Sequence, residues 1–282
     1  MRLRQLAADA ALGNYLRFLA VLVDAQHATL ASLAVTRPAA AQLKAAREQG
    51  MPPIPPAAWL RDAAWSATLA ALCEAVVAQR DFPAGVGETV ARIRRASPDW
   101  LEDQADALLQ AGAGVIDTAA APMIMAALQV HGVALAASLS PAAVHPLDVP
   151  DLCPLCGSPP VASIVCALPP YQGYRYLHCA LCAAEWHRVR VHCTLCGASG
   201  KGIAYQSVTI AGTEENEGDA LEAAVRAETC DDCHGYRKIL YQEKDAEVEP
   251  VADDLASLNL DLLLGQRGYH RGSGNPLLWQ PD

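Results

Sequence analysis

Four Cys-x-x-Cys motifs, all between Cys153 and Cys233, constrain what this chain can fold into more than any other feature. The motifs are CPLC, CALC, CTLC and CDDC, and their cysteines are Cys153, Cys156, Cys179, Cys182, Cys193, Cys196, Cys230 and Cys233. Only Cys73 and Cys166 stand outside them. In a reducing compartment, such clustering indicates metal ligation rather than a disulfide framework.

The spacing within each motif suits a tetrahedral thiolate site. Two cysteines separated by two residues can approach one ion from a single tight turn, a knuckle, and two knuckles complete a four-sulfur shell. Glycine directly after the second cysteine favours the turn, because the backbone there has a positive φ. Gly157 and Gly197 fit this position, whereas Ala183 and His234 do not. We therefore predict two four-cysteine sites of the rubredoxin or zinc-ribbon type.

The alternation of the two knuckle kinds favours pairing in sequence order. Site one would then span residues 153–182 and site two residues 193–233, with one shared strand between them. Each interval between paired knuckles is long enough for a β-hairpin. An interleaved arrangement, with Cys153 and Cys196 on the same ion, stays open at this stage.

The first 140 residues are rich in Ala and Leu with helical spacing, which predicts an α-helical bundle. Ser97-Pro98 is a good N-cap and first-turn pair for one of these helices. Trp59, Leu69, Leu72, Cys73 and Val76 are the expected core of another. The predicted helices cover residues 12–30, 38–50, 59–79, 97–110 and 117–139.

The composition changes near Ser140, where four prolines occur between Pro141 and Pro154. Short β-rich runs then lie beside the knuckles, and we predict strands at 161–165, 174–178, 185–191 and 202–210, a short helix at 219–228 and an amphipathic helix at 252–265. The predicted fold class is α+β. A helical domain (1–145) precedes a small β-rich domain of two tandem four-cysteine modules (146–250) and a C-terminal helix and tail (251–282).

Charge and motif content exclude several functions. The formal net charge is −10, with 31 acidic and 21 basic residues, which argues against a nucleic-acid partner. No phosphate loop, dinucleotide fingerprint or hydrolase motif occurs, and closed four-cysteine sites leave no open position for a substrate, so we predict no enzyme activity.

The same sequence predicts a cytoplasmic protein without membrane insertion. The N-terminus lacks the apolar run and cleavage site of a secretory signal. Residues 112–139 come closest to a membrane span, but Asp117, Pro122, Gln129 and His131 interrupt them.

The knuckles and their surroundings resemble the FdhE family of formate dehydrogenase accessory proteins. The stretch RYLHCALCAAEWHRVRVHCTLCG (175–197) carries the likeness, and its run from Tyr176 to Gly197 is the most specific. The chain departs from the pattern at Ala183, where a knuckle glycine is often expected. The other matching stretches are LGNYLRFLA (12–20), CPLCGSPPVAS (153–163), ETCDDCHGYRK (228–238) and ADDLASLNLDLLL (252–264).

The resemblance implies a cytoplasmic, non-enzymatic factor needed for the maturation of respiratory formate dehydrogenase. Such a factor would bind the catalytic subunit and carry two iron ions on the eight knuckle cysteines. Zinc is the alternative metal, because it competes well for thiolates. A homodimer is compatible with the sequence. Two other functions stay open: a rubredoxin-like electron carrier, and a zinc-ribbon adaptor whose binding to nucleic acid would depend on salt.

Overall fold

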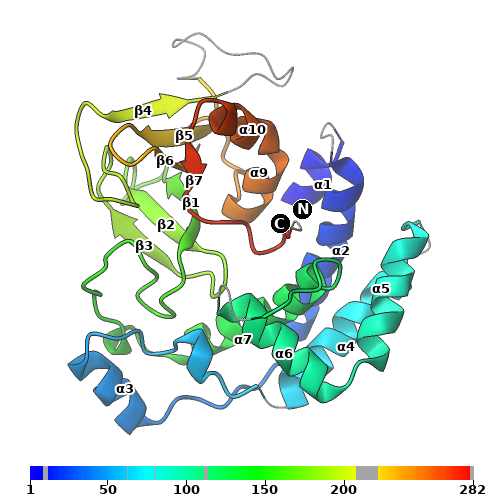
Figure 1. The fold of residues 1–282 in the computed structure, drawn as a ribbon. Helices are drawn as coiled ribbons and strands as arrows, with labels where there is room; N and C mark the ends of the chain where they lie inside the picture. The colour runs from blue at the N-terminus through cyan, green and yellow to red at the C-terminus, as the bar shows by residue number, and fades with distance from the viewer. Residues whose placement is uncertain (9–11, 62, 80, 111–113, 208–221, 280–282) are drawn as a thin grey trace. The chain divides into compact units, whose positions relative to one another are not determined.

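The computed structural model describes residues 1–8, 12–61, 63–79, 81–110, 114–207 and 222–279 (Figure 1). The chain divides into two compact units. The sheet unit consists of residues 1–16, 159–180 and 185–275, and the helical unit consists of residues 17–158, 181–184 and 276–282. The domain limits that we placed at residues 145 and 250 stay a prediction.

The helical unit is built around α7 (Ala121–Ser138), most of which is buried. Helices α4 (Ala63–Val77) and α6 (Pro98–Leu109) pack against α7, and α5 (Ala84–Arg95) packs against α4. The remaining described elements are α2 (Gly13–Leu30), α3 (Ala40–Glu48) and the 3-10 turns η1 (Pro56–Ala58) and η2 (Pro141–Ala143). Among the described residues, α7 alone is long and apolar enough to cross a membrane, and a buried core helix meets the same criterion.

The predicted helices are present, with shifted ends. Ser97 caps α6, and its hydroxyl accepts a hydrogen bond from the backbone N–H of Trp100 at 3.2 Å. The predicted core residues Trp59, Leu69, Leu72, Cys73 and Val76 are all buried. Trp59, however, follows the η1 turn, and α4 begins at Ala63. Helix α5 was not predicted, because Gly85 and Gly87 in its first turns lower the helical propensity.

The sheet unit contains one mixed sheet in the order β3-β2-β1-β6-β5-β4, with β7 beside β6. It consists of two antiparallel three-stranded meanders, β1-β2-β3 and β4-β5-β6, joined by a parallel β1–β6 pair. The strands are β1 (Pro160–Val165), β2 (Arg175–Cys179), β3 (Glu185–Arg188), β4 (Ile203–Gln206), β5 (Val225–Cys230), β6 (Gly235–Tyr241) and β7 (His270–Arg271). This arrangement gives the two predicted modules one shared sheet.

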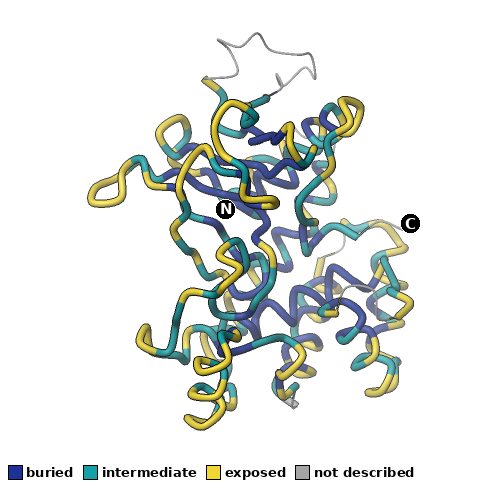
Figure 2. Tube along the Cα trace, turned by 60° about the vertical axis from the view of Figure 1, so that its left-hand side comes forward, coloured by how far each residue is buried: buried dark blue, intermediate teal, exposed yellow. Residues whose placement is uncertain are grey.

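Helices α1 (Arg2–Leu6), α9 (Pro250–Ala256) and α10 (Leu258–Gln266) complete the sheet unit. Helix α9 packs on β1, and α1 packs on α9. Arg2 joins α1 to the unit through ion pairs with Asp253 and Asp245, at 2.6 and 2.7 Å. The central strands β1 and β6 are buried along their whole length. Figure 2 colours the trace by burial, with buried residues in dark blue.

The α+β fold class is confirmed, and three sequence-based details need correction. The helix predicted at 219–228 is wrong over its described part, because Val225–Cys230 pairs as β5 with β4 and β6. The helix predicted at 252–265 is interrupted at Ser257. The strands predicted at 185–191 and 202–210 end at Arg188 and Gln206, and residues 208–210 lie outside the described residues.

A buried carboxylate gives the sheet unit a defined response to acid. Burial disfavours the charged form of Asp254, but Lys238 and Arg271 outweigh burial and hold its pKa below the usual value. A lowered folded-state pKa stabilises the fold above the unfolded pKa, and this stabilisation is lost as the pH falls through the folded pKa. We therefore expect Asp254→Asn to weaken the acid dependence of stability below about pH 4, measured by urea denaturation at several pH values. If the free energy of unfolding of Asp254→Asn falls with pH as steeply as that of the unsubstituted protein, this assignment is contradicted.

Candidate metal centres

Each module positions its four cysteines in the same way. The first knuckle precedes a hairpin, β1-β2 in site one and β4-β5 in site two. The second knuckle begins at the last residue of the second strand, Cys179 in β2 and Cys230 in β5, and continues into the turn before the next strand. Antiparallel pairing of the hairpin therefore returns the second knuckle to the first.

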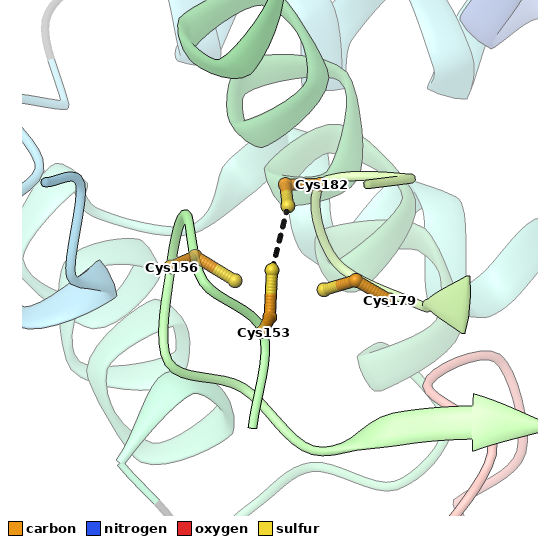
Figure 3. Close-up of side chains that lie close together, drawn as sticks. All are labelled: Cys153, Cys156, Cys179 and Cys182. Atoms are coloured by element: carbon orange, nitrogen blue, oxygen red, sulfur yellow. Dashed lines mark hydrogen bonds between the residues drawn. The ribbon is translucent and has the colours of Figure 1, made fainter. Parts of the chain in front are cut away.

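The structure brings the eight predicted cysteines together in two groups of four, in sequence order. Cys153, Cys156, Cys179 and Cys182 form one group, and Cys193, Cys196, Cys230 and Cys233 form the other. Within each group, all sulfur atoms lie within 4.8 Å of one another. Figure 3 shows the four side chains of site one directed towards a common centre. The interleaved arrangement, with Cys153 and Cys196 in one group, is not seen.

The sulfur distances fit a tetrahedral metal ion and not a disulfide. Cys153 Sγ and Cys182 Sγ are 3.5 Å apart, and the Cys193–Cys233 and Cys196–Cys230 sulfur pairs are each 3.7 Å apart. A metal–sulfur bond of about 2.3 Å in tetrahedral geometry places sulfurs about 3.8 Å apart. A disulfide would require about 2.05 Å. Each group could therefore hold one metal ion.

Backbone hydrogen bonds shape the two first knuckles alike. In site one, Cys153 N donates to Ser158 O at 2.9 Å, and Gly157 N donates to Cys153 O at 2.8 Å. In site two, Cys193 N donates to Ala198 O at 2.8 Å, and Gly197 N donates to Cys193 O at 3.1 Å. The same turn is thus built from CPLCGS and CTLCGA.

In all four knuckles, the residue after the second cysteine has the left-handed backbone conformation, with a positive φ. Gly157 and Gly197 have φ values of 80° and 82°, as expected. Ala183 and His234 adopt φ values of 55° and 54°, although neither is glycine. The turn therefore imposes this conformation regardless of the side chain, which costs alanine more than glycine.

This strain predicts opposite effects for two matched substitutions. Ala183→Gly should stabilise the metal-loaded protein by about 0.5–1 kcal/mol, because glycine accepts a positive φ. Gly197→Ala should destabilise it by about 1 kcal/mol. A Cβ at Gly197 would meet nothing within 4 Å, so backbone strain alone is tested. Thermal unfolding measures both, and a lower midpoint for Ala183→Gly would contradict the argument.

The two sites differ in their exposure. All four cysteines of site one are buried, whereas Cys196 of site two is exposed and Cys233 is half-buried. Burial raises the pKa of Cys193 to about 12, whereas the backbone N–H of Ala198 lowers the pKa of Cys196. A bound metal would favour the thiolate at every position.

Arg237 on β6 supports the first knuckle of site two, a role that the sequence did not reveal. Its side chain is buried, and Arg237 Nε donates to Thr194 Oγ1 at 2.8 Å, between Cys193 and Cys196. Arg237 also donates to Ser273 and to the carbonyl of Pro160. The guanidinium group thus fixes the knuckle to the sheet.

The other cysteines and nearby histidines lie outside both groups. Cys73 is buried in α4 and Cys166 is half-buried after β1. His178 Nδ1 lies 3.1 Å from Glu185 Oε1, and His192 Nε2 lies 2.9 Å from Arg188. These contacts agree with a position on the sheet rather than with metal ligation.

Comparisons with known proteins cover nearly the whole chain. Family models match in succession: FdhE N-terminal at residues 1–148, FdhE central domain at 152–190 and FdhE C-terminal domain at 191–278. Protein FdhE from Escherichia coli strain K12 / DH10B is 41% identical over 280 residues, which cover 99% of this chain and 86% of that protein. Protein FdhE from E. coli O9:H4 strain HS gives the same values.

A solved structure agrees with these matches. The crystal structure of the FdhE protein from Pseudomonas aeruginosa has a TM-score of 0.85 and 38% sequence identity, covering 98% of this chain and 93% of that one. The fold and the cysteine groups define an α+β protein with two tandem modules suited to metal binding. The chain belongs to the FdhE family, which confirms the resemblance seen in the sequence.

Proposed function

We propose that this protein is a cytoplasmic accessory factor for the maturation of respiratory formate dehydrogenase, carrying one iron ion in each four-cysteine site. Family membership over nearly the whole chain supports the accessory role. The observation that carries the metal part is the gathering of eight sulfurs into two groups of tetrahedral size. The ligands would be Cys153, Cys156, Cys179 and Cys182 in site one, and Cys193, Cys196, Cys230 and Cys233 in site two.

The donor set suggests what the metal would supply. Four thiolates form a closed shell without a position for a substrate, which supports a role other than catalysis. Iron in such a shell can change between the ferrous and ferric states, whereas zinc has no redox chemistry. Iron would therefore let the factor exchange electrons, and zinc would exclude electron exchange.

Metal content tests the first part of the proposal. Protein purified from its own host should contain two equivalents of transition metal, and ferric iron in thiolate shells should make it red. Variants in which both cysteines of one knuckle are changed to serine provide the control, and each should contain one equivalent less. Less than one equivalent of any transition metal in carefully prepared protein would contradict the proposal, and zinc would exclude the iron assignment.

The partner is tested separately. The protein should recover the catalytic subunit of formate dehydrogenase in a pull-down, because a maturation factor must contact the subunit before the enzyme is complete. Nucleic acid serves as the negative control, since the net charge of −10 disfavours such a partner. Failure to recover the subunit under both oxidising and reducing conditions would count against the proposal.

Exposure of Cys196 favours one further candidate function, a rubredoxin-like electron carrier. A carrier needs a site that a redox partner can approach, and site two offers an exposed sulfur. Voltammetry of the iron-loaded protein should then show a fast, reversible couple. Absence of such a couple would leave the accessory role without electron transfer.

A further inference from the structure

Site one is covered by other parts of the helical unit. Ile54 N donates to Leu155 O at 3.0 Å, within the knuckle Cys153–Cys156. A Cβ at Gly157 would lie 3.1 Å from Pro52 Cγ, which shows how closely the proline-rich segment 51–56 approaches the same knuckle. On the second knuckle, a Cβ at Gly132 would lie 2.9 Å from Leu181 O. Both knuckles of site one therefore lie beneath packed chain.

Site two has a much thinner cover. Cys196 is exposed, and so are its neighbours Leu195 and Gly197. On the other knuckle, Asp231 and Asp232 are exposed between Cys230 and Cys233. Solvent and small molecules can therefore reach this group without any rearrangement of the fold.

The side chain of Leu195 shields one side of site two only. Its methyl groups lie 2.7 Å from a Cβ built at Gly235 and 2.6 Å from one built at Gly272. The Cβ built at Gly235 is also 3.2 Å from Cys233 Sγ. Leu195 therefore lies over the Cys233 side of the group. Cys196 remains exposed beside this leucine.

We propose that site two exchanges its metal directly with ligands in solution or on a partner, whereas site one retains its metal as a structural element. The inference rests on the metal ligation proposed above and adds a division of roles between the sites. In the exchange, the bond from the metal to Cys196 breaks while a bond to the incoming ligand forms. The metal keeps its oxidation state, and the released thiolate takes a proton from water.

Burial determines the difference in rate. An incoming ligand reaches site two in the native state, but it reaches site one only after local opening of the covering segments. Opening adds a free-energy cost before any metal–sulfur bond can break. Metal release from site one should therefore be slower by about tenfold or more.

Chelator competition tests the proposal on the full chain. Protein loaded with two equivalents of Zn²⁺ is mixed, without oxygen, with an excess of the chromogenic chelator 4-(2-pyridylazo)resorcinol. We expect two phases of one equivalent each, with rates that differ by about tenfold or more. Release of both equivalents in a single phase would overturn the proposal.

Alkylation of the native protein shows which site releases its metal in the fast phase and which in the slow phase. N-ethylmaleimide added after the fast phase should modify the site-two cysteines, Cys196 among them, while mass spectrometry finds Cys153, Cys156, Cys179 and Cys182 unmodified. Half-buried Cys166 reacts independently of metal and is counted separately. Earlier modification of the site-one cysteines would reverse the assignment.

A matched pair of variants provides a second check. Cys196→Ser should abolish the fast phase and keep the slow one, and Cys156→Ser, at the same place in the first knuckle of site one, should do the opposite. If Cys156→Ser does not fold, alkylation of the protein without substitutions still decides the outcome. A protein that binds no metal would refute the proposed function, whereas two bound ions released together would refute only the exchange role.

Discussion

Lys238→Met should destabilise the sheet unit by about 3–5 kcal/mol, because it breaks a buried charge network. Lys238 on β6 is 1% exposed, and Asp254 on α9 is completely buried. Lys238 Nζ lies 2.6 Å from Asp261 Oδ2 and 3.3 Å from Asp254 Oδ1. It also donates to the carbonyl of Asp254 at 2.7 Å. Methionine preserves much of the volume but removes one of the two cations, Lys238 and Arg271, that neutralise Asp254 and Asp261.

A surface lysine provides the control for this prediction. Lys244 pairs with Glu222 at 2.7 Å, but Glu222 is largely exposed. Lys244→Met should therefore cost less than about 1 kcal/mol. Urea denaturation followed by circular dichroism measures both variants. Equal shifts for Lys238→Met and Lys244→Met would show that the buried network does not stabilise the sheet unit.

Gly132→Ala should destabilise the helical unit by about 1–3 kcal/mol, although it removes a glycine from a helix. A Cβ at Gly132 would lie 2.6 Å from the Trp59 ring and 2.9 Å from the backbone oxygen of Leu181. The ring and the backbone cannot both move away without disturbing the packing. Replacing glycine with alanine in a helix stabilises it by about 1 kcal/mol through helical propensity. The cost of the two clashes should exceed this gain.

Gly85→Ala in α5 is the control, because it changes the helical propensity without creating a clash. A Cβ at Gly85 meets nothing within 4 Å, so this variant should be stabilised by up to about 1 kcal/mol. Tryptophan fluorescence during urea denaturation follows both variants, and Trp59 is one of the five tryptophans that contribute to the signal. Leu181 lies between Cys179 and Cys182, so Gly132→Ala should also weaken metal binding at site one. Stabilisation by both alanines would contradict the packing argument.

The sequence predicts features that depend on local spacing. The Cys-x-x-Cys motifs and the alternation of Gly157 and Gly197 with Ala183 and His234 predict the grouping of the sulfurs. Ser97-Pro98 predicts the start of α6, because an N-cap acts within one turn. Chain-local signals of this kind need no knowledge of the tertiary fold.

Features that depend on distant partners were missed. Strand β6 contains Arg237 and Lys238, both buried. These charged residues interrupt the apolar pattern by which a buried strand is predicted from sequence. They are accommodated because Thr194 and Asp254 lie far along the chain but close in space. Strand β5 has the composition of a helix, and only its pairing with β4 and β6 makes it extended.

The parallel β1–β6 pair limits how the protein can be divided experimentally. Cutting the chain between the meanders would leave β1 on one fragment and β6 on the other, each with an unpaired edge made of residues that are buried in the intact sheet. Unpaired strand edges of this kind recruit further strands and promote aggregation. Single-site versions of the protein should therefore be made by cysteine substitution in the full chain rather than by truncation.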